Sequence, residues 1–180
     1  MVCCAVPPVP DFSADSAGNS SGGSAAYGLS PAEVRALDTA FHLAQRAGQA
    51  RDIPVGAVVL TPEGIVAGLG LNQREIPPHD PSAHAEIVAL REAAGRLESW
   101  NLQGCTLVVT LEPCTMCAGA IVNARISRLI FGAWDPKAGA CGSVRDVVRD
   151  SRLNHQVEVR GGVDELRIKA LLREFFSARR

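Results

Sequence analysis

Four side chains that could bind and use a metal ion fall into two short segments of the sequence. The first is His84-Ala85-Glu86, and the second is Pro113-Cys114-Thr115-Met116-Cys117. Imidazole and thiolate are good zinc ligands, and a catalytic zinc site commonly has three protein ligands and leaves the fourth position to water. We therefore predict that His84, Cys114 and Cys117 bind one zinc ion and that Glu86 remains available to move protons.

The pattern formed by these four residues, which resembles that of the zinc nucleobase deaminases, implies a hydrolytic deamination. Zinc lowers the pKa of its water from about 15.7 to roughly 7, so that hydroxide is available at neutral pH. The expected nucleophile is zinc-bound hydroxide, which attacks a ring carbon that carries an exocyclic amine. Glu86 would take the water proton and return it to the ring nitrogen and the departing ammonia. His-x-Glu followed by Pro-Cys-x-x-Cys is typical of the zinc nucleobase deaminases.

Cysteines three positions apart also fit other kinds of site, namely half of a structural zinc site or a redox pair. A structural site needs four protein ligands, and His42, His79 and His155 belong to no second ligand pair. Cys105 and Cys141 could supply a fourth ligand, but Cys105 begins a hydrophobic run and Cys141 lies in a Gly/Ala-rich segment. We interpret both as small buried residues and favour the catalytic site.

Both metal-binding segments lie where a strand or loop leads into a helix. A further helix start is Ser30-Pro31-Ala32-Glu33, with a capping serine, a proline at the first position and glutamate three residues after the serine. We expect helices at 30–48, 83–97, 115–124 and 164–178, strands at 54–60, 65–69, 105–110, 128–132 and 156–159, a hairpin turn at 61–64 and a loop at 133–143. Strands that alternate with helices predict an α/β sheet covered on both faces.

The chain of 180 residues is long enough for one domain and an appendage. Residues 1–28 are rich in Ser, Gly, Ala and Pro, so we predict a disordered tail followed by a zinc-dependent deaminase domain at 29–180. Six cysteines, two of them in the zinc pattern, favour a reducing compartment, and we expect a cytoplasmic protein. No apolar run reaches the roughly 18 residues of a membrane span.

The net charge of −1 does not by itself indicate a nucleic-acid-binding protein. Any site for a polyanion must therefore be local. The last 36 residues contain nine Arg or Lys and six Asp or Glu. The candidates for phosphate contacts are Arg145, Arg149, Arg152, Arg173, Arg179 and Arg180. Ordinary solvated arginines are an equally good interpretation of each.

Four segments carry a resemblance to a known family. They are 52–58 (DIPVGAV), 79–87 (HDPSAHAEI), 110–120 (TLEPCTMCAGA) and 131–139 (FGAWDPKAG). Over about residues 30–180 the chain resembles the bacterial tRNA-specific adenosine deaminases of the cytidine/deoxycytidylate deaminase superfamily. The resemblance implies a three-layer α/β/α cytidine-deaminase-like fold with a central mixed sheet of about five strands. It also implies a homodimer with active sites near the interface and one zinc ion per subunit.

The reaction implied by the resemblance is conversion of adenosine to inosine at the wobble position of a tRNA anticodon, with an arginine tRNA as the expected substrate. The anticodon stem-loop would be the partner. The implied substrate-binding residues are Asn72, Ile53, Ala85, Asp135, Phe176 and Arg179. Asn72 would hydrogen-bond the flipped adenine and Asp135 the neighbouring ribose, although Asn is also a common turn residue.

The end of the chain would meet the anticodon loop through Phe176 and Arg179, whereas Phe175 continues an apolar stripe and is expected in the core. Trp134 could either stack on a base or pack against the protein. The zinc motif is shared with cytosine, cytidylate and guanine deaminases, so the motif alone does not choose the base. A free-base or nucleotide deaminase and a non-catalytic, zinc-stabilised RNA-binding module remain as alternatives.

Overall fold

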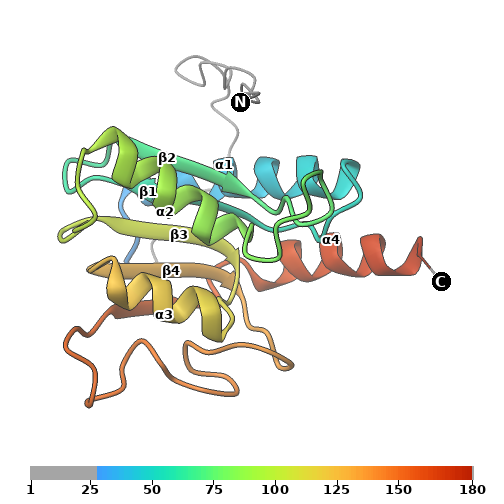
Figure 1. Cartoon of the computed structure of the whole chain (residues 1–180). Coiled ribbons are helices and arrows are strands. Elements are labelled where there is room, and N and C mark those ends of the chain that lie inside the picture. The colour runs from blue at the N-terminus through green and yellow to red at the C-terminus, as the bar shows by residue number, and fades with distance from the viewer. Residues whose placement is uncertain (1–27, 180) are drawn as a thin grey trace.

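A five-stranded sheet with helices on both faces forms residues 28–179, the part of the chain that the computed structural model describes (Figure 1). The strands are β1 (Gly56–Leu60), β2 (Val66–Leu71), β3 (Thr106–Leu111), β4 (Arg128–Ala133) and β5 (Glu158–Gly161), and the helices are α1 (Pro31–Gln49), α2 (Ala85–Arg96), α3 (Thr115–Asn123) and α4 (Glu165–Ser177). The predicted α/β fold with a mixed sheet is thereby confirmed. The disorder predicted for residues 1–28 lies, except for Gly28, outside the described residues.

The strand order is β2-β1-β3-β4-β5, with β1 antiparallel to both β2 and β3 and with β3, β4 and β5 parallel. The hairpin predicted around 61–64 is the β1–β2 connection. The strand predicted at 156–159 begins two residues later, at Glu158. The reason is its pairing partner: β4 begins at Arg128, which stands opposite Glu158 and forms an ion pair with it at 3.1 Å.

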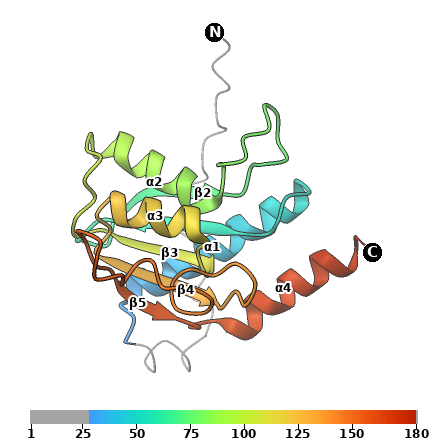
Figure 2. The same ribbon diagram turned by 60° about the horizontal axis from the view of Figure 1, so that its bottom comes forward.

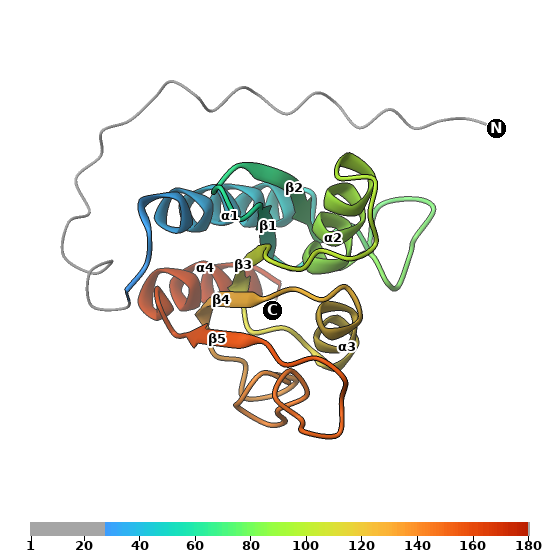
Figure 3. The same cartoon turned by 90° about the vertical axis from the view of Figure 1, so that its left-hand side faces the viewer.

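Helices α1 and α4 cover one face of the sheet and α2 and α3 cover the other (Figure 3). Alternate residues of each strand point to opposite faces. The face under α1 is formed by Val58, Leu60, Val108 and Ile130, and the face under α2 and α3 by Ala57, Val59, Leu107, Val109, Leu129 and Phe131. None of the helices within residues 28–179 is both long and apolar enough to cross a bilayer.

Two strand glycines allow helices to lie directly on the sheet. A Cβ atom on Gly56 would be 2.1 Å from the carbonyl oxygen of Ala40 in α1, and one on Gly70 would be 2.0 Å from the carbonyl oxygen of Ala85 in α2. Any side chain at Gly70 would therefore push the first turn of α2 away from β2. That turn carries one of the two metal-binding segments.

The long connection between β4 and β5, drawn in orange, lies beside α3 and β5 (Figures 1 and 2). It contains the loop predicted at 133–143. Isolated bridges pair Cys114 with Gly139 and Cys141 with Asp146, so that the connection joins the start of α3 directly. Arg125, just after α3, donates a 2.6 Å hydrogen bond to Asn154 near the other end of the connection.

Candidate active site

The starts of helices α2 and α3 bring the three predicted zinc ligands together. His84 is the N-cap residue of α2, Cys114 is the N-cap residue of α3, and Cys117 lies in the first turn of α3. Neither N-cap side chain hydrogen-bonds the backbone of its own helix, which leaves both to face a ligand. The Nδ1 atom of His84 lies 3.8 Å from the Sγ atom of Cys114 and 3.6 Å from the Sγ atom of Cys117.

The spacing of these atoms fits a zinc ion. With Zn–S bonds of about 2.3 Å and Zn–N bonds of about 2.0–2.1 Å, tetrahedral coordination separates nitrogen and sulfur ligands by about 3.6 Å. The three ligand atoms lie within 4.8 Å of one another, and no other group of three such ligands occurs in the described part of the chain. Three ligands without a fourth match a catalytic site better than a structural one.

Hydrogen bonding divides the protons unequally between the two thiols. Contacts with Cys117 and His84 lower the pKa of Cys114 to about 3. The contact with Cys114 raises the pKa of Cys117, and burial raises it further. The pKa of His84 is raised, chiefly by its hydrogen bond to Cys114. Before a metal binds, the pKa of the Cys114 thiol is therefore lowered and that of the Cys117 thiol is raised, so that binding of a zinc ion to both sulfurs would displace a proton from Cys117.

Glu86 lies in the first turn of α2 and is only 4% exposed. In a regular helix, residues two apart point to different sides. His84 lies just before the helix and has an extended backbone, so the side chains of His84 and Glu86 are not constrained to point apart. Burial raises the pKa of Glu86 to about 7. A carboxyl group that can gain or lose a proton near neutral pH suits general acid–base catalysis.

Three of the predicted substrate-binding residues, Ile53, Asn72 and Ala85, form one hydrogen-bonded wall. Asn72 is buried directly after β2, its Oδ1 atom accepts the backbone N–H of Ala85 at 2.9 Å, and its own N–H donates to Val55 at 3.1 Å. The backbone N–H of Ile53 donates to Asp52 at 2.7 Å. Asn72 is therefore more than a turn residue, because it ties the β2 end to the start of α2.

Asp52, which the sequence interpretation passed over, organises this wall. It is fully buried, and its carboxylate accepts backbone N–H groups from Ile53 and, at 3.0 Å, from Glu75 in the β2–α2 connection. The only sequence signal was an acidic residue next to the apolar run of β1. Such residues are usually solvated, so the signal was weak.

The fourth predicted contact, Asp135, lies in the β4–β5 connection, which is joined to Cys114 by the bridge from Gly139. Its carboxylate accepts the backbone N–H groups of Lys137 at 2.9 Å and Ala138 at 3.3 Å. Its own N–H donates to Glu112 at 3.0 Å. Glu112, like Asp52, is buried and was missed, since an acidic residue at the end of an apolar strand has no distinctive pattern.

The structure resolves several of the alternatives left open by the sequence. Trp134 is half-buried and packs edge-on against Phe131, with ring centroids 4.7 Å apart, so its ring packs against the core while part of it stays exposed. Cys105 and Cys141 are buried and stand apart from the ligand group. The Cys141 thiol donates to the carbonyl of Pro113 at 3.8 Å.

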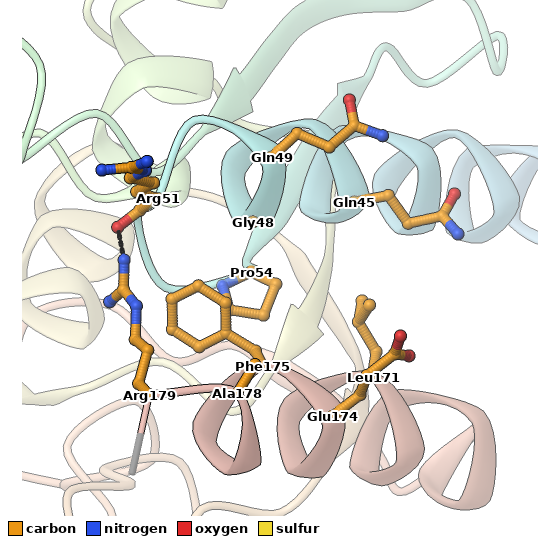
Figure 4. Close-up of a pocket in the computed structure, with 10 residues that line it drawn as sticks. All are labelled: Gln45, Gly48, Gln49, Arg51, Pro54, Leu171, Glu174, Phe175, Ala178 and Arg179. Carbon is orange, nitrogen blue, oxygen red and sulfur yellow. Dashed lines mark hydrogen bonds between the residues drawn. The ribbon is translucent and has the colours of Figure 1, made fainter.

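The end of α4 meets the end of α1 at a pocket of about 660 Å³ (Figure 4). The ring of Phe175 lies beside Pro54, and the Arg179 guanidinium stacks over that ring at 4.1 Å while donating to the backbone carbonyl of Arg51. The side chain of Phe176 counts as exposed, at 50%, whereas that of Phe175 is more deeply buried. The predicted RNA roles of Phe176 and Arg179 stay predictions. Arg179 contacts Arg51, which lies two residues before Ile53 in the sequence.

The other candidate arginines differ in their partners. Arg149 pairs with Asp146 at 2.8 Å and Arg152 with Asp150 at 2.5 Å, within the β4–β5 connection. Arg173 donates to the backbone carbonyl of Lys169. Arg180 lies outside the described residues.

Comparisons with known proteins agree with this geometry. The family described as the cytidine and deoxycytidylate deaminase zinc-binding region matches residues 31–133. A tRNA-specific adenosine deaminase of Haemophilus influenzae is 47% identical over 141 residues, which are 78% of this chain and 81% of the relative. A solved chain from work on A-to-I editing by tRNA:A34 deaminases at the wobble position has a TM-score of 0.73 and 38% identity, covering 77% of this chain and 99% of that one.

A more distant solved structure, the guanine deaminase from Nitrosomonas europaea, has a TM-score of 0.65 and 26% identity, and covers 84% of this chain and 95% of its own. The chain therefore belongs to the cytidine and deoxycytidylate deaminase family, and within it to the tRNA-specific adenosine deaminases. The resemblance seen in the sequence and the expectation of an enzyme are both confirmed.

Proposed function

We propose that the protein hydrolytically deaminates adenosine to inosine at the wobble position of a tRNA anticodon, with an arginine tRNA as substrate. It acts in the cytoplasm as a homodimer with one zinc ion per subunit. The observation that carries the proposal is the meeting of His84, Cys114 and Cys117 at zinc-ligand distances beside the buried carboxyl of Glu86. Water and adenosine enter, and inosine and ammonia leave.

His84, Cys114 and Cys117 would hold the zinc ion, and three protein ligands are the number typical of a catalytic zinc site. A bound zinc ion supplies hydroxide at neutral pH by lowering the pKa of water. Glu86 accepts one proton from the attacking water and delivers it to the ring nitrogen N1. It then takes the proton of the hydroxyl group newly bonded to C6 and gives it to the departing amine, so that the C6–N bond breaks, ammonia leaves and the carbonyl of inosine forms. Its pKa of about 7 lets the same carboxyl act as base and then as acid.

The predicted substrate-binding residues receive the extruded nucleotide. Asn72 uses its Oδ1 atom on Ala85, which leaves its amide N–H groups for an acceptor on the base. Ile53 and Ala85 lie on the same wall as Asn72, and Asp135, in the β4–β5 connection, provides a carboxylate for the ribose. Phe176 and Arg179 contact the anticodon loop, whose unpaired bases can be turned out at a cost of only a few kcal/mol.

The relatives support this choice of substrate. The Haemophilus influenzae relative is a tRNA-specific adenosine deaminase, and the solved chain with 38% identity comes from work on tRNA:A34 deaminases. Each is covered by this chain over most of its own length. The tRNA preference and the role of Glu86 are carried to this chain by the site geometry together with these relatives.

The test is deamination of an anticodon stem-loop with adenosine at the wobble position, using zinc-loaded protein. We expect inosine from the arginine stem-loop, and Glu86→Gln should lower kcat about 10²–10⁴-fold because the proton shuttle is lost. Zinc content should stay unchanged. Glu63→Gln, the same substitution on the exposed β1–β2 turn, is the matched control and should retain activity.

A free-base deaminase is the second candidate, favoured by the likeness to the guanine deaminase from Nitrosomonas europaea. Turnover of free guanine or cytosine, with no inosine in the stem-loop, would replace the leading proposal by this one. A Glu86→Gln variant that behaves like the wild type in every assay would instead indicate a zinc-stabilised RNA-binding module.

A further inference from the structure

Glu112 is a buried carboxylate whose hydrogen bonds all go to one loop. It follows β3 directly and is only 2% exposed. Its Oε1 atom accepts the backbone N–H groups of Cys141 and Ser143, each at 3.0 Å, and its Oε2 atom accepts the backbone N–H of Asp135 at 3.0 Å. A single charged group therefore gathers both ends of the segment from 135 to 143.

The same segment is joined to the metal-binding cysteines through the residues next to Glu112. The backbone N–H of Ala140 donates to the carbonyl of Pro113 at 2.9 Å, and Gly139 pairs with Cys114 in an isolated bridge. The space is filled: a Cβ atom on Gly139 would be 2.3 Å from the Glu112 Oε2 atom. Glu112 thus lies between a proposed zinc ligand and the loop that carries the proposed ribose contact.

A buried carboxylate must be compensated by hydrogen bonds, because its removal from water otherwise costs free energy. Three backbone donors satisfy Glu112. The other hydrogen bonds of Asp135 stay within the same loop: its carboxylate accepts the N–H groups of Lys137 and Ala138, and its carbonyl accepts the N–H of Gly139 at 3.1 Å. Glu112 is therefore the side chain from outside the loop that bonds the Asp135 backbone. The Ser143 hydroxyl adds one bond, to the Asp135 carbonyl at 2.8 Å.

We propose that Glu112 is a positioning residue for substrate binding. By holding the backbone N–H of Asp135 it keeps the Asp135 carboxylate at a set distance from the metal ligand Cys114, so that the ribose and the reacting base are bound in register. The proposal rests on the proposed function for its substrate, but not for the hydrogen bonds that carry it.

Glu112→Gln is the informative substitution because it has the same size and breaks a defined part of the network. The amide oxygen can keep the N–H groups of Cys141 and Ser143, but the amide NH₂ then faces the N–H of Asp135, and two donors cannot bond. We expect the KM for the anticodon stem-loop to rise about tenfold, with kcat within about twofold of the wild type and zinc content unchanged.

A double-mutant cycle separates positioning from general damage. If Glu112 acts through Asp135, then Glu112→Gln should raise the KM of an Asp135→Ala protein by less than about twofold, a clear departure from additivity. Asp52→Asn is the matched control, because it changes another buried carboxylate whose backbone partners, Ile53 and Glu75, lie outside the 135–143 loop. Its effect on KM should multiply with that of Asp135→Ala. The proposal would be overturned if the effect of Glu112→Gln on KM multiplied with that of Asp135→Ala as fully as the effect of Asp52→Asn does.

Amide hydrogen exchange tests the same contact without any reaction. In zinc-loaded Glu112→Gln protein the Asp135 amide should exchange about tenfold faster or more, whereas amides of β3 should be unchanged. If that variant does not fold, Ser143→Ala loosens the same segment from an exposed side chain and should raise KM about two- to threefold. Wild-type protein that forms no inosine would refute the proposed function, and unchanged exchange at Asp135 would refute the role of Glu112.

Discussion

The metal centre and the 133–143 loop are neighbours with different means of support. The proposed metal ligands lie at the starts of α2 and α3, and α2 in turn lies directly on β2 at Gly70. The loop has no regular element and is held by the Glu112 carboxylate and a few backbone hydrogen bonds. The proposed metal ligands therefore depend on closely packed backbone, whereas the proposed ribose contact depends on hydrogen bonds that a single substitution can remove.

This difference predicts how substitutions in the two regions affect the protein. A defect behind the metal centre should impair folding, metal binding and catalysis together. A defect in the loop should leave the metal in place and change substrate affinity. The predictions that follow probe this contrast, beginning with the metal centre.

Loss of a ligand should have the largest effect. Cys117→Ser should abolish stoichiometric zinc binding and lower deaminase activity by about 10³-fold or more, because hydroxide is no longer available at neutral pH. Cys105→Ser is the matched control, since Cys105 is also buried but is not in the ligand group. Metal analysis and single-turnover assays decide the matter, and equal zinc loss in both variants would contradict the ligand assignment.

Backbone packing behind the ligands should come next. Gly70→Ala places a methyl group 2.0 Å from the Ala85 carbonyl oxygen, so we expect a loss of about 1–3 kcal/mol in the free energy of unfolding together with weaker zinc binding. Gly95→Ala in α2 has open space around it and should raise stability by up to about 1 kcal/mol. Urea titrations of both variants give the comparison; a Gly70→Ala protein as stable as the wild type would show that α2 can move.

Zinc affinity should rise with pH. The pKa of Cys117 is raised and that of His84 is raised, so both hold protons that zinc must displace, while Cys114 with a pKa of about 3 is already a thiolate. Zinc binding therefore releases protons near neutral pH, and the Kd should fall by about tenfold or more for each unit of pH increase. Calorimetry in buffers with different ionisation enthalpies counts the protons. Binding without proton release would mean that Cys117 is not a ligand.

The smallest effect is expected at the far end of α4. Arg179→Ala should weaken stem-loop binding a fewfold and reduce the slope of log K against log salt by about 0.7, the value for one single-strand phosphate contact. Arg152→Ala is the control, because Arg152 is 85% exposed and already paired with Asp150. Equal changes in the salt slope for both variants would show that Arg179 is an ordinary surface charge and makes no phosphate contact.

Much of the fold could be predicted from local patterns. The capping box at Ser30 and Glu33, the hairpin around 61–64 and the alternation of strands with helices correspond to observed elements. The error at β5 arose because a short, partly exposed strand has little pattern of its own. Its limits depend on its partner, where Glu158 meets Arg128 across the sheet.

The sequence by itself determined the family and the candidate zinc ligands, because zinc ligands at fixed spacing need particular residue types and a helix start to present them. His84, Cys114, Cys117 and Glu86 could therefore be named from two short segments. Only the tertiary structure revealed Asp52 and Glu112, whose carboxylates tie together the segments that carry the predicted substrate-binding residues. Apart from Ile53, their partners are backbone N–H groups more than 20 residues away, and a backbone group leaves no mark on the amino-acid sequence.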